Sequence, residues 1–96
     1  MKPSEALALK RDELGAVVAR YPMKNLRLFG SALHGQDRED SDLDLLVDPL
    51  PGTTLIDLGG LQRELEVLLG VPVHLLTPGF ISEKFRAQVL AEARPV

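Results

Sequence analysis

Two aspartates separated by one leucine, Asp42 and Asp44, are the residues whose types and spacing best support chemistry. They stand at the start of an apolar run, residues 43–47, which predicts a strand. Alternate side chains of a strand point to the same face, so the two carboxylates are expected to project together. Adjacent carboxylates repel each other unless a cation lies near them. The pair therefore indicates a site for a divalent metal ion.

A glycine and a serine, Gly30 and Ser31, follow an earlier apolar run at residues 26–29. Glycine lets the backbone approach a phosphate closely, and the serine hydroxyl and nearby N–H groups can donate hydrogen bonds to phosphate oxygens. Magnesium is commonly held by one or two carboxylates together with substrate phosphates. Either element alone more often forms an ordinary turn or a solvated strand end. Together, on strands of one sheet, they indicate a nucleoside triphosphate site.

The apolar periodicity predicts the elements that position these residues. We expect helices at residues 4–20, 31–34, 54–69 and 82–93, and strands at residues 26–29, 43–47 and 71–76. Ser4 is the expected N-cap of the first helix. The acids of the loop at residues 36–41, which are Asp37, Glu39 and Asp40, are expected to be solvated, and Asp48 is expected in a turn. The order α-β-α-β-α-β-α predicts an α/β (α+β) fold, a small sheet flanked by helices.

Length and composition limit the classes of function. The 96 residues are expected to form a single domain, residues 1–96. The net charge of −3 disfavours direct nucleic-acid binding, which usually requires a basic face. No apolar run approaches the length of a membrane span, and the absence of cysteine suits a reducing compartment. The net charge does not exclude a nucleotide bound through metal, and we expect a cytoplasmic protein.

The residues Gly30, Ser31 and Gly35, followed by residues 41–47 (SDLDLLV), resemble the signature of the DNA polymerase β-like nucleotidyltransferase superfamily. The short length and the third strand with one closing helix resemble its minimal nucleotidyltransferase branch, and the resemblance covers nearly the whole chain. It implies a mixed β-sheet flanked by helices.

The resemblance also implies roles for residues of this sequence. Asp42 and Asp44 would bind Mg²⁺, or Mn²⁺, and would be catalytic. Gly30 and Ser31 would hold the phosphates of ATP. We also predict Ser41 to be a nucleotide-binding residue, and we expect its side chain to cap or brace the backbone of Asp42.

One position departs from the family pattern. His74 stands where the resemblance leads us to expect a third acid, in the segment at residues 69–76 (LGVPVHLL). Imidazole can act as a base near neutral pH, but it is a poorer magnesium ligand than a carboxylate. Three interpretations stay open: a catalytic base, a ligand that shifts the choice of metal, or a sign that catalysis has been lost.

Members of the minimal branch are commonly antitoxins encoded beside a HEPN-domain ribonuclease toxin, and some transfer AMP from ATP to a toxin hydroxyl. The resemblance therefore implies a metal-dependent nucleotidyltransferase with a HEPN toxin as partner. The alternative is a catalytically weakened antitoxin that binds the nucleotide or the toxin and neutralises its partner by stoichiometric contact. Part of the last helix, near Phe80, Ile81 and Phe85, is a candidate surface for that partner.

Overall fold

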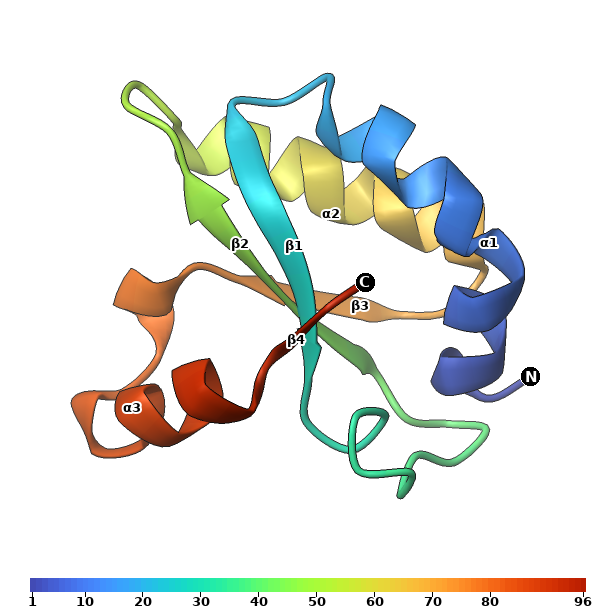
Figure 1. Cartoon of the computed structure of the whole chain (residues 1–96). Helices are drawn as coiled ribbons and strands as arrows, with labels where there is room; N and C mark the ends of the chain where they lie inside the picture. The colour runs from blue at the N-terminus through green and yellow to red at the C-terminus, as the bar shows by residue number, and fades with distance from the viewer.

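The computed structural model describes residues 1–96 (Figure 1). Its helices and strands are α1 (Pro3–Val18), β1 (Met23–Phe29), β2 (Leu43–Pro49), α2 (Leu55–Leu69), β3 (Val73–Leu76), the short 3₁₀ helix η1 (Pro78–Phe80), α3 (Glu83–Glu92) and β4 (Arg94–Pro95). None of the helices is both long and apolar enough to cross a membrane.

The four strands form one sheet in the order β3-β2-β1-β4. β1 pairs antiparallel with both β2 and β4, whereas β2 and β3 are parallel. This confirms the mixed β-sheet flanked by helices. Because β2 lies in the interior of the sheet, both of its faces are covered. Leu45 and Leu46 point to opposite faces and both are fully buried, which explains the continuous apolar run of this strand.

Helices α1 and α2 lie side by side against one face of the sheet (Figure 1). They share a core with Leu43, Leu45 and Val47 of β2, the three residues that strand alternation predicts to face away from the aspartates. The other face of the sheet is covered less closely, since α3 contributes no buried residue. The face that carries Asp44 is therefore the more open one.

Helix α2 begins and ends where its sequence predicts. The Thr54 side chain accepts a hydrogen bond from the N–H of Asp57 (3.2 Å), and Gly70 closes the helix with φ of +71°. The helix runs through Gly59 and Gly60 despite their low helix propensity. A Cβ atom on Gly60 would lie 3.2 Å from the ring of Tyr21, so this glycine lets the ring pack against the helix.

Residues 31–34 do not form the short helix that we expected. They form consecutive turns, in which the N–H groups of Leu33 and His34 both donate to the carbonyl of Gly30 (3.1 and 3.4 Å). Glycines with positive φ, Gly30 at +75° and Gly35 at +69°, bound the segment and leave it too short to propagate a helix. The two-residue strand β4 and the 3₁₀ helix η1, at an expected turn, were also not foreseen, so the observed order differs from the expected one at three places.

The open edge of the sheet at β3 is capped by side chains of α2. The N–H of Val73 donates to Glu66 Oε2 (3.0 Å), and the N–H of Leu75 donates to Gln62 Oε1 (3.3 Å). Unpaired N–H groups on an edge strand invite pairing with another chain. These two side chains therefore protect the edge.

Replacing Glu66 and Gln62 together by alanine is expected to increase self-association, because it frees the N–H groups of Val73 and Leu75. Each lost hydrogen bond should also lower the free energy of unfolding by about 0.5–1.5 kcal/mol. Sedimentation at increasing concentration measures the first effect, and denaturant unfolding measures the second. Arg63→Ala, on an exposed position of the same helix, is the control. Sedimentation that is unchanged from that of the unaltered chain at high concentration would contradict the protective role.

Candidate active site

Asp44 lies at the centre of the candidate site because of the pairing of its strand. It is opposite Phe29 of β1 in the antiparallel pair and opposite His74 of β3 in the parallel pair. Directly paired residues of neighbouring strands place their side chains on the same face within contact distance. The sheet thus brings Asp44, His74 and the turn that begins at Gly30 together, although they are far apart in the sequence.

Gly30 is held against the carboxylate of Asp44. A Cβ atom on Gly30 would lie only 2.1 Å from Asp44 Oδ2, and the φ of +75° is one that other residues rarely adopt. Both constraints require glycine at this position. The turn therefore carries a glycine because its backbone must pass directly beside the acid.

His74 is the only side chain that forms an ion pair with Asp44. Its Nδ1 lies 3.4 Å from Asp44 Oδ1, and the side chain of His74 is 58% exposed whereas that of Asp44 is 24% exposed. The sequence position that the resemblance assigns to a third acid is thus beside Asp44 in space. Because Nδ1 faces the carboxylate, Nε2 is left for a ligand or solvent.

Burial raises the pKa of Asp44 above its ordinary value, and the negative charge of Asp42 raises it further. The charge and the hydrogen bond of His74 act in the opposite direction, but each is a smaller effect than burial and the pKa stays raised. The ionised form of Asp44 is therefore short of positive partners within the chain. A bound cation would supply that partner.

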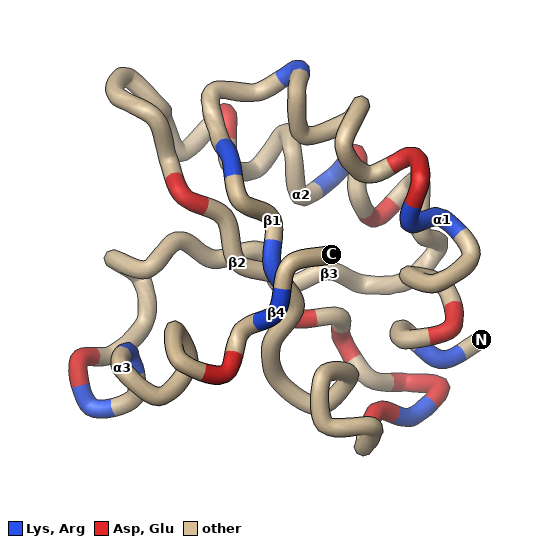
Figure 2. The backbone as a smooth tube through the Cα atoms, viewed as in Figure 1, with Lys and Arg blue, Asp and Glu red and all other residues tan.

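Asp42 is exposed and lies one residue before the start of β2. It is followed by Leu43, whose N–H donates to the carbonyl of Pro72 (2.9 Å) and so ties this end of β2 to the segment before β3. The segment from Asp37 to Asp44 holds five acidic residues and one basic residue, and Figure 2 shows them gathered on one stretch of the backbone. This local charge favours cations and disfavours a free polyphosphate.

The donor set fits magnesium bound together with a substrate. No group of three or more His, Cys, Asp or Glu side chains is arranged to hold a metal by itself. The two carboxylates of Asp42 and Asp44 match the one or two protein ligands that Mg²⁺ usually takes when phosphates and water complete its octahedron. The chemistry of these donors is therefore compatible with Mg²⁺ held jointly by protein and phosphates.

Ser41 is placed differently from our expectation. Its Oγ accepts a hydrogen bond from the N–H of Arg38 (2.9 Å), and its own N–H donates to the Arg38 carbonyl (3.0 Å). The serine therefore braces the loop at residues 38–41 instead of the backbone of Asp42. A role in nucleotide binding stays a prediction.

Two acids were assigned wrongly from the sequence. Asp37 is buried, not solvated. Asp48 belongs to β2 and not to a turn, and its carboxylate binds Arg27 Nη2 (2.5 Å) and Asn25 Nδ2 (2.9 Å). A signal for Asp48 was present, because it shares the strand alternation of Asp42 and Asp44. No local pattern identified Asp37, since its partner lies on α1.

The candidate site is open, not enclosed. None of the hollows of the surface is lined by Gly30, Asp44 or His74. A groove of about 380 Å³ lies instead between α1 and the C-terminal residues. A ligand at Asp44 would therefore be held by polar contacts and metal more than by apolar enclosure.

Comparison with known proteins identifies the class. The family model described as nucleotidyltransferase domain matches residues 12–96. A solved structure assigned to a minimal nucleotidyltransferase superposes with a TM-score of 0.85 at 42% identity, and the match covers 97% of this chain and 95% of that one. The chain belongs to the nucleotidyltransferase domain family, within its minimal branch.

Relatives in this family extend the comparison. A Methanocaldococcus jannaschii protein with a provisional assignment as a protein adenylyltransferase is 35% identical over 77 residues, 80% of this chain and 83% of the relative. The protein adenylyltransferase MntA of Thermococcus cleftensis is 34% identical over 73 residues, 76% of this chain and 74% of the relative. A crystal structure described as a toxin–antitoxin with AMP-PNP shares the fold, with a TM-score of 0.73 at 21% identity over 88% of this chain and 69% of that one.

Proposed function

We propose that this chain transfers AMP from ATP to a hydroxyl group of a partner protein, and that the partner is a HEPN ribonuclease toxin. Membership of the nucleotidyltransferase family and the relatives named as protein adenylyltransferases support the reaction. The fold shared with toxin–antitoxin structures supports the kind of partner. Because the reaction consumes ATP, the proposal places the chain in the cytoplasm.

One observation carries the proposal. Asp44 is packed against Gly30 on one side and His74 on the other, with Asp42 two residues away. A carboxylate pair beside a glycine–serine turn is an arrangement suited to a metal-bound triphosphate. Asp44 is partly buried, and His74 is its only potential cationic partner. Burying a carboxylate in this way costs free energy, so a purely structural role does not explain this aspartate.

Asp42 and Asp44 would hold Mg²⁺, or Mn²⁺, and the bound ion would neutralise phosphate charge and orient the triphosphate. Gly30 would let the backbone approach the phosphates, and the hydroxyl groups of Ser31 and Ser41 would donate hydrogen bonds to them.

The chain's own residues would then position two reactants. The oxygen of the acceptor hydroxyl forms a bond to the α-phosphorus of ATP, and the bond from that phosphorus to the bridging oxygen of pyrophosphate breaks. His74 takes the proton that leaves the hydroxyl, since its side chain is 58% exposed and Nδ1, not Nε2, faces Asp44. Holding the hydroxyl in line with the leaving group supplies most of the remaining acceleration.

The proposal is tested by mixing the chain, a HEPN toxin encoded beside it, Mg²⁺ and ATP labelled at either the α- or the γ-phosphate. Transfer of AMP predicts label on the toxin from α-labelled ATP only. Label from the γ position would indicate a phosphoryl transferase instead. A tight complex without any label would favour the stoichiometric antitoxin.

Replacing His74 separates its possible roles. If His74 is the base, His74→Ala should lower the rate of AMP transfer by about 100-fold or more while leaving the affinity for Mg²⁺–ATP nearly unchanged. Single-turnover transfer and equilibrium nucleotide binding measure the two quantities. An increase in transfer on His74→Asp, from an inactive starting chain, would instead mark His74 as the site of lost catalysis.

A further inference from the structure

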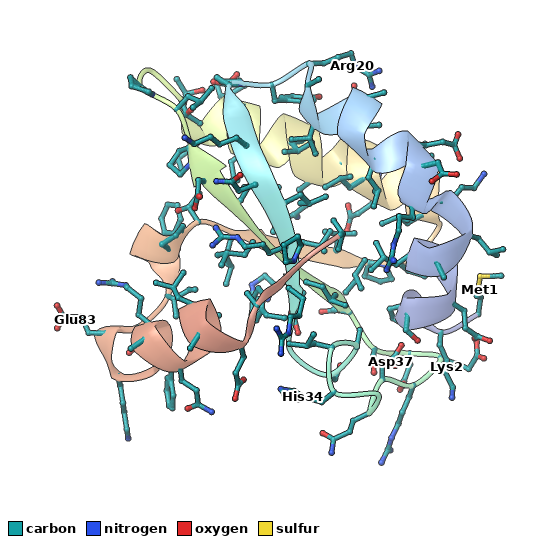
Figure 3. All side chains as sticks on the ribbon, viewed as in Figure 1. Met1, Lys2, Arg20, His34, Asp37 and Glu83 are labelled. Atoms are coloured by element: carbon teal, nitrogen blue, oxygen red, sulfur yellow. The ribbon has the colours of Figure 1, made fainter.

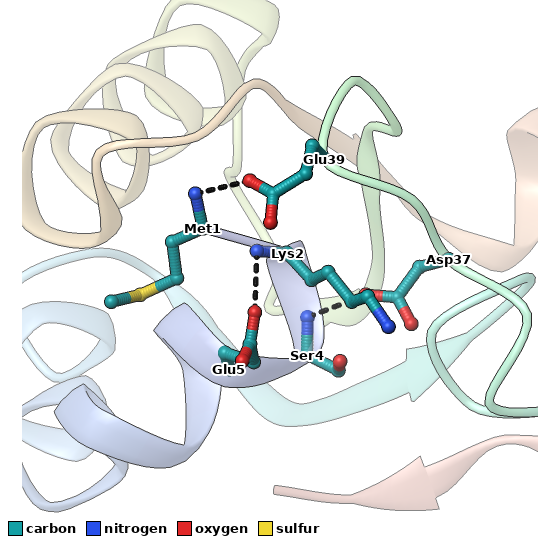
Figure 4. Close-up of polar contacts among 6 residues, drawn as sticks. All are labelled: Met1, Lys2, Ser4, Glu5, Asp37 and Glu39. Atoms are coloured by element: carbon teal, nitrogen blue, oxygen red, sulfur yellow. Dashed lines mark hydrogen bonds and ion pairs between the residues drawn. The ribbon is translucent and has the colours of Figure 1, made fainter.

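Asp37 is the one buried acid of the loop between the glycine–serine turn and Asp42. It is 7% exposed, whereas Glu39 and Asp40 of the same loop are exposed. Its Oδ2 accepts a hydrogen bond from the N–H of Ser4 (2.8 Å), which lies in the first turn of α1 (Figure 4). Figure 3 shows Asp37 at this end of the helix, close to Lys2.

This hydrogen bond caps the N-terminus of α1 with a side chain that is distant in the sequence. Our expectation that Ser4 is the N-cap was wrong, because the helix begins at Pro3 and Ser4 lies inside its first turn. The first N–H groups of a helix have no partner within it, and the helix dipole favours an anion there. The hydrogen bond from the Ser4 N–H is the main cause of the lowered pKa of Asp37, so the carboxylate stays ionised although it is buried.

The loop at residues 36–41, which holds Asp37, connects the two halves of the candidate site, the glycine–serine turn and the aspartates that begin at Asp42. At its start the N–H of Gln36 donates to the carbonyl of Ser31 (2.9 Å), and at its end Arg38 and Ser41 bond to each other directly before Asp42. Glu39 also pairs with the amino group of Met1, but both groups are largely exposed, and such pairs contribute little. Asp37 is thus the buried anchor between the loop and the helix layer.

We propose that Asp37 is a positioning residue of the nucleotide site: by accepting the hydrogen bond of α1, it holds the loop that sets the separation between the Ser31 turn and Asp42. Only the identity of the ligand, a nucleotide, rests on the proposed function. The anchoring itself is a property of the chain alone. Without the anchor, only the exposed pair of Glu39 with the amino group of Met1 would hold the loop between its two ends, and the local stability of the loop would fall.

A simple helix cap would stabilise α1 without affecting the site, and a matched variant separates the two roles. Thr54 caps α2 through the N–H of Asp57, beyond the end of β2 that lies away from Asp42. Thr54→Ala therefore removes a comparable cap without touching the loop. Asp37→Asn keeps an oxygen acceptor for the Ser4 N–H and tests rescue.

The first measurement is amide hydrogen exchange of the full chain without ligand. Asp37→Ala is expected to accelerate exchange at the N–H groups of Arg38 and Ser41 several-fold more than Thr54→Ala does. Equal exchange in the two variants would overturn the proposal, whatever the site binds. All variants are compared at a temperature at which circular dichroism shows each of them folded.

The second measurement is the affinity for AMP-PNP in excess Mg²⁺, determined by calorimetry. Asp37→Ala is expected to weaken binding by about tenfold, Asp37→Asn to restore most of it, and Thr54→Ala to leave it unchanged. A loosened loop with unchanged affinity would make Asp37 a helix cap only and would overturn the positioning role. An unaltered chain that binds no nucleotide would contradict the proposed function, while the exchange result would still decide whether Asp37 anchors the loop.

Discussion

Asp44→Asn is expected to reduce AMP transfer by more than about 100-fold. The loss of a residue that only hydrogen-bonds to a metal ligand typically costs about 10–100-fold, and Asp44 is expected to be a ligand itself. The asparagine side chain is nearly the same size but is a poorer ligand for a hard cation. Label transfer from α-labelled ATP measures the loss. Asp48→Asn is the matched control, because Asp48 lies at the other end of the same strand and pairs with Arg27. A comparable loss of AMP transfer in both variants would show that Asp44 has no specific role in catalysis.

The same substitution is expected to leave the fold intact and, without metal, to increase its stability at neutral pH. The folded pKa of Asp44 is raised above its ordinary value of 3.8, mainly by burial. A carboxyl group of this kind stabilises the fold below its unfolded pKa, and that contribution is lost as the pH rises through the folded pKa. Asp44→Asn should therefore gain in melting temperature relative to the unaltered chain as the pH rises above about 3.8. Thermal unfolding in chelator checks this, and a destabilised variant at neutral pH would contradict it.

Gly30→Ala is expected to have the second large effect, on both stability and activity. The left-handed backbone alone costs an L-residue about 1–2 kcal/mol. In addition, the new Cβ atom would lie 2.1 Å from Asp44 Oδ2, so either the carboxylate or the turn must move. We expect a loss of nucleotide binding together with a drop in the free energy of unfolding. Denaturant unfolding and calorimetry measure the two effects.

Gly35 provides the control for Gly30. It has a similar φ, +69°, but nothing lies within 4 Å of a Cβ atom placed on it. Gly35→Ala should therefore show the backbone cost without the collision. The excess cost of Gly30→Ala should also shrink when Asp44 is replaced by alanine, because the colliding group is then absent. Equal costs at Gly30 and Gly35 would show that Asp44 is not held against the turn.

Residues with local causes were predicted well from the sequence. The alternation of β2 places Leu43, Leu45 and Val47 in the core, because a strand in the middle of a sheet must bury that face. Thr54 and Gly70 mark the ends of α2, since a cap and a left-handed residue act within one turn. Around the site, Gly30 lies beside Asp44 and His74 is paired with Asp44 across the sheet, while the roles of these residues stay predictions.

Features that depend on distant partners were not predictable in this way. Asp37 resembles any solvated loop acid until α1 is placed beside it. The pair of residues in β4 becomes a strand only because β1 offers an edge to it. In each case the tertiary contact, and not the local pattern, decides the structure.

The most direct test of the central claim is a count of AMP groups transferred per molecule of this chain. The toxin partner is supplied in large molar excess with ATP and Mg²⁺, and intact-mass spectrometry follows the toxin over time. Catalysis by the site around Asp44 predicts that the modified toxin exceeds the amount of this chain, and that Asp44→Asn abolishes the modification. Toxin that is bound one-to-one but remains unmodified would contradict the account.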